Sequence, residues 1–127
     1  MALSPYIVTK GVVLRETETR DADKILTLLT AERGKLSVIA RGVCRKGCKF
    51  AACAQPLAYS EWTLYKKGDW YYANEGATLE LFNGLRADLD AMALGFYLAE
   101  LTEAVTTEDA PHQELLSHLL NGLYAIS

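Results

Sequence analysis

Over the first two thirds of the chain, short apolar runs alternate with polar or glycine-containing turns, which is the pattern of β-strands joined by hairpins. Residues 25–30 fit a helix or a strand on periodicity alone, but the turn at Gly34 favours a strand paired with residues 35–41. Gly11 is expected to bend or bulge the first strand, and Gly76 to interrupt the last one. The pattern therefore predicts five strands: residues 6–15, 25–30, 35–41, 57–65 and 70–82.

Polar segments separate these strands. Residues 16–23 and 66–69 read as turns, and residues 42–54 form a longer loop without a clear period. Five short antiparallel strands with one longer loop between the third and the fourth are typical of an OB-fold barrel. The predicted fold class is α+β, with an antiparallel OB-fold domain over residues 1–82 and an α-helical segment over residues 83–127.

The period changes near residue 85, where apolar residues begin to recur every three or four positions. A helix is predicted over 85–105, capped by Asn83, with Asp88 and Asp90 in its first turns. A second helix is predicted over 111–125. Two outcomes remain open for the helices: they fold back on the barrel, or they face another copy or the rest of a longer chain. The second helix carries a stripe of Leu115, Leu116, Leu119, Leu120 and Leu123.

The composition fits one domain, or a small domain with an appendage. The chain has 127 residues, of which 50% are hydrophobic and 23% are charged, so a packed core is expected. No apolar run approaches the roughly 20 residues of a membrane span, and the N-terminus lacks the features of a signal peptide. We therefore expect no membrane contact and a cytoplasmic location. The three cysteines are an odd number, which predicts reduced thiols.

Charge is distributed unevenly along the chain. Residues 1–60 carry ten basic and five acidic side chains, whereas residues 61–127 carry three basic and eleven acidic ones. No acidic residue occurs between Arg33 and Ser60. Such a basic segment attracts polyanions, although a solvated loop without a partner is the simpler alternative. Its cations are Arg33, Lys35, Arg41, Arg45, Lys46 and Lys49.

OB-fold barrels bind single-stranded nucleic acid by combining a basic groove with aromatic faces on which bases stack. Six aromatic residues lie on the last two predicted strands, and by alternation about half should point into the barrel core. Two or three are therefore candidates for stacking. The six are Tyr59, Trp62, Tyr65, Trp70, Tyr71 and Tyr72.

Cys44, Cys48 and Cys53 invite a metal interpretation, but a structural zinc site needs four ligands. The two histidines, His112 and His118, lie far along the chain. Three small, half-buried side chains are the simpler interpretation. A third one is redox sensitivity, because nearby cations would favour the thiolates of Cys44 and Cys48. No metal site is predicted.

An enzymatic function is not indicated. The sequence contains no G-x-S-x-G, H-E-x-x-H or G-x-x-x-x-G-K motif. His118 lies on the predicted amphipathic helix, where an ordinary surface histidine explains it. The prediction is a protein without catalytic residues and without a cofactor.

Several segments together resemble the RecO family of bacterial recombination mediators. The resemblance covers essentially the whole chain, but only about the first half of a typical family member. It rests on KGVVL (10–14), DKILTLLT (23–30), RGKLSVIARG (33–42), QPL (55–57) and LAEL (98–101).

The resemblance implies an OB-fold followed by a helical domain, and binding of single- and double-stranded DNA with annealing of complementary strands. It also implies recombinase loading together with RecR and single-strand-binding protein as partners. The remainder of the helical domain and a small cysteine-based zinc module of some relatives would be missing from this chain. Cys44, Cys48 and Cys53 depart from the family pattern, in which small or hydroxyl residues occupy this loop.

Carried over to this sequence, the resemblance places DNA contacts on the basic loop. Each contact would be to phosphate, with stacking on a base as an alternative for Arg45. The runner-up function is a protein-interaction fragment whose basic loop docks an acidic partner. The candidate DNA contacts are Arg41, Arg45, Lys46 and Lys49, then Arg33 and Lys35, and finally Lys24, which nearby aspartates partly neutralise.

Overall fold

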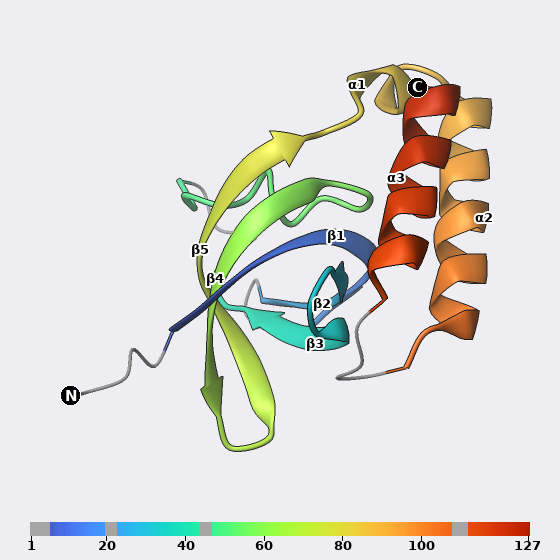
Figure 1. Cartoon of the computed structure of the whole chain (residues 1–127). Helices are drawn as coiled ribbons and strands as arrows, with labels where there is room; N and C mark the ends of the chain where they lie inside the picture. The colour runs from blue at the N-terminus through green and yellow to red at the C-terminus, as the bar shows by residue number, and fades with distance from the viewer. Residues whose placement is uncertain (1–5, 20–22, 44–46, 108–111) are drawn as a thin grey trace.

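The computed structural model describes residues 6–19, 23–43, 47–107 and 112–127, and in it five strands form a closed barrel with helices against one side (Figure 1). The barrel confirms the OB-like architecture that the strand pattern predicted. In the described part of the chain, no helix is both long and apolar enough to cross a membrane. The strands are β1 (Tyr6–Glu18), β2 (Lys24–Thr30), β3 (Gly34–Ala40), β4 (Tyr59–Lys67) and β5 (Trp70–Glu80).

The strands follow one another around the barrel in the order β1-β2-β3-β5-β4, and β4 pairs with β1 to close it. Four pairings are antiparallel, whereas β3 and β5 run parallel, with Val38 opposite Tyr71 and Ile39 opposite Tyr72. The expectation of an entirely antiparallel barrel was therefore wrong in this detail. A closed ring with an odd number of strands cannot alternate direction all the way round, so at least one pair has to be parallel.

Two strands are longer or more continuous than predicted. β1 extends beyond Arg15 because residues 16–18 still pair with β2, and its irregularity falls between Val13 and Arg15, not at Gly11. β5 continues through Gly76. Both glycines instead permit a close approach, since a Cβ at Gly11 would lie 3.0 Å from the Leu29 carbonyl oxygen and one at Gly76 3.1 Å from Cys53 Sγ.

The barrel interior is one of two hydrophobic cores. Trp62 and Leu64 of β4 are fully buried in it, while Glu61 before them is exposed and Thr63 between them is half-buried, as a period of two predicts. The long β3–β4 loop covers part of the barrel, because Phe50 and Cys53 pack against the same core. The loop therefore belongs to the body of the barrel.

The second core lies between the outer wall of the barrel and the helices. Val12 and Leu14 of β1 face this core, whereas Val13 between them faces the barrel interior. The helices thus fold back on the barrel, which was one of the two outcomes left open. The buried members of this core are Val12, Leu14, Leu29, Leu57, Phe82, Leu85, Ala99, Leu116, Leu119 and Leu123.

The helices are α1 (Asn83–Arg86), α2 (Leu89–Val105) and α3 (Gln113–Ile126). The single helix expected over 85–105 is therefore two helices. The predicted cap at Asn83 was wrong, because Asp88 lies in an extended conformation and its carboxylate accepts hydrogen bonds from the backbone N–H groups of Asp90 and Ala91. Pro111, the predicted start of the last helix, lies outside the described residues.

Candidate nucleic-acid interface

Three tyrosines from neighbouring strands lie side by side on the barrel, and we call them the tyrosine row. Tyr65 of β4 stacks on Tyr72 of β5 with ring centroids 5.3 Å apart and planes at 14°. Tyr6 of β1 meets Tyr65 edge-on, at 6.3 Å and 88°. The row arises from strand register, because Tyr65 is the direct cross-strand partner of both Tyr6 and Tyr72.

One cation of the predicted set adjoins this row, and a second lies in the β3–β4 loop. Arg41, directly after β3, is exposed and places its guanidinium carbon 4.9 Å from the centroid of the Tyr72 ring. Lys49, another residue of the predicted set, is exposed in the β3–β4 loop, where it lines a small pocket with Asn74 and Glu75 of β5. Arg45 and Lys46, which lie between them in sequence, are outside the described residues.

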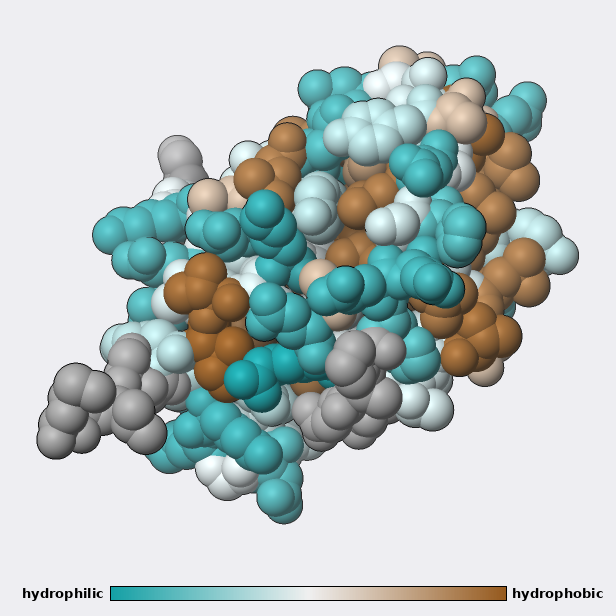
Figure 2. Space-filling model, in the orientation of Figure 1, coloured by the Kyte–Doolittle hydropathy of each residue, from teal (hydrophilic) through white to brown (hydrophobic). Residues whose placement is uncertain are grey.

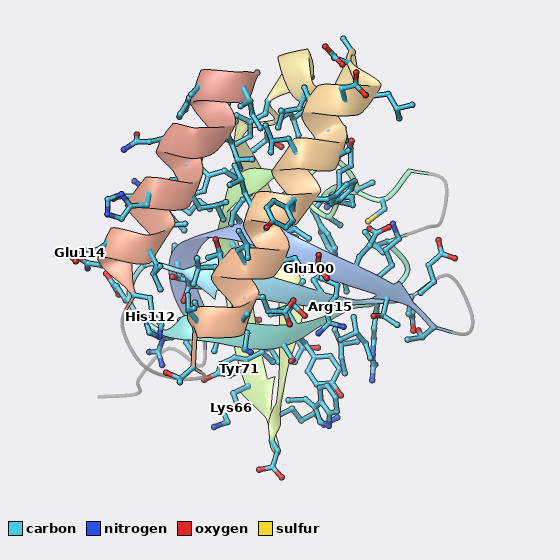
Figure 3. All side chains as sticks on the ribbon, turned by 90° about the vertical axis from the view of Figure 1, so that its right-hand side faces the viewer. Arg15, Lys66, Tyr71, Glu100, His112 and Glu114 are labelled. Carbon is cyan, nitrogen blue, oxygen red and sulfur yellow. The ribbon has the colours of Figure 1, made fainter. Side chains whose placement is uncertain are left out.

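The β4–β5 hairpin adds cations that the sequence reasoning did not select. Lys66 and Lys67 are exposed, and Lys66 Nζ lies 5.6 Å from the centroid of the Tyr71 ring (Figure 3). Trp70, at the other side of the turn, is 45% exposed. Lys66 and Lys67 were not selected because the second half of the chain has a net negative charge. Their position between the aromatic residues Tyr65 and Trp70 was the sequence signal that could have identified them.

The six aromatic candidates divide as the alternation predicted. Trp62 and Tyr71 are buried in the barrel core. Tyr59 packs beside the second core, and its burial raises the pKa of its hydroxyl group. Tyr65, Trp70 and Tyr72 remain at least partly accessible on the outside of the barrel.

The remaining predicted cations do not join this surface as free charges. Lys24 is half-buried, and its Nζ donates a hydrogen bond to Glu16 Oε2 at 2.8 Å. Arg33 and Lys35 lie at the start of β3, about 20 Å along the strand from Arg41 at its end. Lys35 lies on the side of the barrel that the helices cover, and its backbone N–H donates a hydrogen bond to the Thr107 carbonyl oxygen at 3.3 Å.

The cysteines do not form a recognisable metal site among the residues that the structure describes. Cys53 is buried, with Sγ 3.3 Å from the hydroxyl oxygen of Thr78, and Cys48 is half-buried. Cys44 is outside the described residues. Within the described ranges, no three His, Cys, Asp or Glu side chains gather as metal ligands would.

A closed five-stranded barrel with a long β3–β4 connection and an attached helical layer defines the class of OB-fold proteins. Within that class, the chain belongs to the recombination protein O family. The family profile described as "Recombination protein O N terminal" matches residues 1–82, and the one described as "Recombination protein O C terminal" matches residues 86–127.

Individual relatives agree with this assignment. The chain is 34% identical over 122 residues to the DNA repair protein RecO of Acetivibrio thermocellus, covering 96% of this chain and 49% of the relative. It is 33% identical over 114 residues to the protein of the same name from Bacillus subtilis, covering 90% and 45%. The Salinibacter ruber protein is 31% identical over 129 residues, covering 100% and 50%. The chain thus spans about half the length of these relatives.

Proposed function

We propose that this chain takes part in recombinational DNA repair by binding DNA on the outer face of its barrel, without catalysing a reaction. The observation that carries the proposal is the tyrosine row with the guanidinium group of Arg41 over Tyr72. Aromatic faces beside exposed cations suit single-stranded DNA, whose unpaired bases can stack while its phosphates are neutralised. The names of the relatives, all DNA repair proteins, support the same role.

The proposed mechanism divides the surface into two tasks. Arg41 and Lys49 contact phosphates, with Lys66 and Lys67 of the hairpin as additional cations. These contacts position the strand without reading its sequence. Accessible tyrosines and Trp70 supply stacking, which tolerates every base because each base has a π-face. Arg45 and Lys46 join the phosphate contacts on sequence grounds.

The further steps belong to the whole protein and rest on the family resemblance. They are the annealing of complementary strands and the loading of recombinase together with RecR and single-strand-binding protein. The barrel would contribute by holding a strand with its bases accessible. The proposal includes no cofactor, because both tasks need only charge and stacking.

The test is a fluorescence-anisotropy titration of a labelled single-stranded oligonucleotide at several salt concentrations. Arg41→Ala should weaken binding and lower the slope of log affinity against log salt by about 1, because one phosphate contact is lost. Tyr72→Leu keeps an apolar side chain on β5 but removes the stacking face. It should weaken binding about fivefold or more with the salt slope unchanged, since stacking contributes roughly 1–3 kcal/mol per base.

The matched control is Lys10→Ala. Lys10 is an exposed cation of β1 opposite Glu61, outside the tyrosine row. This variant should bind like the unmodified chain, with a change in salt slope well below 1. If Arg41→Ala and Tyr72→Leu also bind normally, the barrel face is not the DNA site, and an acidic protein partner becomes the better proposal for the basic loop.

A further inference from the structure

Asp23 lies directly before β2 and holds the backbone that follows β3. Its Oδ1 accepts a hydrogen bond from the Gly42 N–H at 2.6 Å. The contact follows from strand register. Lys24 lies opposite Ala40 in the β2–β3 ladder, which places Asp23 and Arg41, the residues just beyond this pair, at the same end of the ladder. Asp23 therefore ties the start of β2 to the turn in which Arg41 lies.

Arg41 lies between two backbone positions that the fold holds in place. Before it, Ala40 is fully buried in the barrel core. After it, Gly42 has a φ of 66°, in the left-handed region, and the hydrogen bond to Asp23 fixes the N–H of this residue. The side chain of Arg41 thus starts from a constrained backbone and lies with its guanidinium carbon 4.9 Å from the centroid of the Tyr72 ring.

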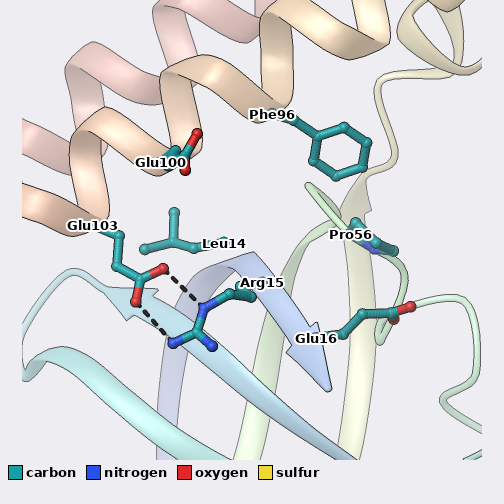
Figure 4. A pocket seen from close by; sticks show the side chains of 7 residues that line it. All are labelled: Leu14, Arg15, Glu16, Pro56, Phe96, Glu100 and Glu103. Carbon is teal, nitrogen blue, oxygen red and sulfur yellow. Dashed lines mark hydrogen bonds and ion pairs between the residues drawn. The ribbon is translucent and has the colours of Figure 1, made fainter. Parts of the chain in front are cut away.

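The basic side chains of β1 and β2 have carboxylate partners of their own. Lys24 donates a hydrogen bond to Glu16. Arg15 pairs with Glu103 in a groove between β1 and α2 (Figure 4). Among the residues that the structure describes, Arg41 forms no ion pair. Its guanidinium group is therefore available to a phosphate, while its position depends on the neighbouring backbone.

The other cations of the candidate interface lack such a hold on their backbone. Lys66 and Lys67 lie toward the projecting end of the β4–β5 hairpin, where the surface is hydrophilic (Figure 2). Lys49 is exposed in the β3–β4 loop. Within the described ranges, no carboxylate accepts a hydrogen bond from the backbone beside any of these lysines. Arg41 differs from them because Asp23 holds the next residue.

We propose that Asp23 is a positioning residue for DNA binding, which keeps Arg41 oriented toward a phosphate by holding the Gly42 N–H. The inference rests on the proposed function, because it requires that Arg41 contacts DNA. Association has to order mobile side chains, and a cation that is ordered beforehand avoids part of that cost. The negative charge of Asp23 opposes DNA binding, whereas its hydrogen bond favours binding. Substitutions can separate these two effects.

The decisive comparison is between Asp23→Asn and Asp23→Ala in the oligonucleotide titration. Both variants remove the same charge, but only asparagine keeps a side-chain oxygen that can accept from the Gly42 N–H. Asp23→Asn should bind DNA at least as tightly as the unmodified chain, and Asp23→Ala about two- to tenfold more weakly than Asp23→Asn. The salt slopes of the two variants should be equal, because Arg41 still reaches a phosphate in both. Equal affinities of the two variants would overturn the proposal.

The same pair of variants in an Arg41→Ala background shows whether Asp23 acts through Arg41. The difference between asparagine and alanine should disappear there, because no guanidinium group is left to position. An unchanged difference would assign Asp23 to the general support of the fold and contradict a positioning role. Arg41→Ala alone separates the two proposals. If it binds DNA normally, the proposed phosphate contact fails and the positioning role with it. If it binds weakly while the two Asp23 variants bind equally, only the positioning role fails.

Asp88 provides the matched control, because its carboxylate also accepts backbone hydrogen bonds, but at the start of α2. Asp88→Asn and Asp88→Ala should differ less than twofold in their affinity for DNA. A difference as large as that of the Asp23 pair would mean that any loss of a backbone contact weakens binding, which contradicts a specific role of Asp23. Circular dichroism establishes folding. If Asp23→Ala unfolds, Asp23→Leu takes its place, since leucine keeps the branched shape of asparagine without an acceptor.

Hydrogen exchange at the Gly42 amide reports on the bond directly and needs no DNA. Exchange should be slow in the unmodified chain and in Asp23→Asn, and faster in Asp23→Ala. Equal exchange rates in all three proteins would show that the Gly42 N–H is protected by another contact, and Asp23 would then not be the residue that holds this turn.

Discussion

Leu57 and Phe82 hold unusual backbone conformations where the barrel meets the helices. Their φ angles are 67° and 55°, in the left-handed region that apolar side chains rarely occupy. Such conformations cost of order 1–3 kcal/mol each, so the surrounding structure has to stabilise them. Both side chains are buried in the second core, and the Leu57 N–H donates to the Val13 carbonyl oxygen at 2.8 Å. Packing and this hydrogen bond offset the strain.

Gly95 of α2 lies close to the Leu57 side chain, which leads to a prediction about two helical glycines. A Cβ at Gly95 would lie 2.9 Å from Leu57 Cδ1, whereas one at Gly122 of α3 would meet Leu98 Cδ1 at 3.3 Å. Alanine gains about 1 kcal/mol of helix propensity over glycine at either position. Overpacking against the fully buried Leu57 costs roughly 1–3 kcal/mol. We expect Gly95→Ala to destabilise the chain by about 1 kcal/mol and Gly122→Ala to be neutral or stabilising, in urea unfolding.

The Gly122→Ala variant is the control, because Leu98 is half-buried and can rotate away. If both variants raise the free energy of unfolding equally, Leu57 repacks easily, and its left-handed backbone is not fixed by contact with α2.

At the level of elements, an ion pair joins β1 to the end of α2. Arg15 Nε and Nη2 donate to the two carboxylate oxygens of Glu103 at 3.1 and 2.9 Å. The pKa of Glu103 is lowered, chiefly by the hydrogen bond from Arg15 and also by the charges of Arg15 and Lys35. Arg15 is 59% exposed, so solvent screens the pair and it contributes about 0.5–1 kcal/mol.

A pH dependence follows from this pair. A carboxyl group with a lowered pKa in the folded state stabilises the fold fully above its ordinary pKa of 4.5, and the stabilisation is lost as pH falls through the lower folded value. Glu103→Gln should therefore lower Tm by about 2–4 °C at pH 7. The gap between the variant and the unmodified chain should close at pH values well below 4.5.

Glu100→Gln is the matched control, because Glu100 lies one turn earlier on the same helix and pairs with no residue in the described ranges. Its Tm should not differ from that of the unmodified chain in a pH-dependent way. A Tm difference for Glu103→Gln that stays constant down to low pH would mean that the pair acts through packing and not through charge.

The elements also indicate how far the sequence alone could lead. The period of two in residues 57–65 puts Trp62 and Leu64 on one face of the strand, and the structure shows that this face is the inner one. The leucine pattern of α3 was sufficient to identify its buried side. The cap at Asp88 was missed because Asn83-Gly84, a few residues earlier, carries an equally good local capping signal. A glycine in a strand can mark a bulge or the close approach of another segment of the chain, and only the tertiary contacts distinguish the two.

The candidate site was less accessible to prediction because it depends on register. Tyr6, Tyr65 and Tyr72 are distant in sequence and become neighbours only when three strands pair in one particular register. The pairing of Lys24 with Glu16 likewise requires the observed β1–β2 hairpin. The charge pattern of the sequence could identify a basic segment, but not which of its side chains are free of ion pairs in the folded chain.

At the scale of the whole molecule, β1 serves two cores at once. Val13 faces the barrel interior, while Val12 and Leu14 face the helices. The division into a barrel over residues 1–82 and a helical segment over 83–127 stays a prediction. We expect a single cooperative thermal transition, with the near-ultraviolet signal of Trp62 and the far-ultraviolet helical signal changing together.

Residues 1–82 produced alone should have a lower Tm or lack a cooperative transition, because Val12, Leu14 and Leu29 would lose the cover of α2 and α3. Two separate transitions in the whole chain, with residues 1–82 as stable as before, would contradict this expectation and favour two independent domains.

The separation of charge between barrel and helices has a consequence for encounter kinetics. Residues 1–82 carry twelve basic and nine acidic side chains, whereas residues 83–127 carry one basic and seven acidic ones. The molecule therefore has an electric dipole, with its positive end in the barrel. The field of a polyanion exerts a torque on this dipole and turns the barrel toward the polyanion before contact. A larger fraction of collisions is therefore productive. The torque fades as the Debye length shrinks to about 10 Å at 0.1 M salt.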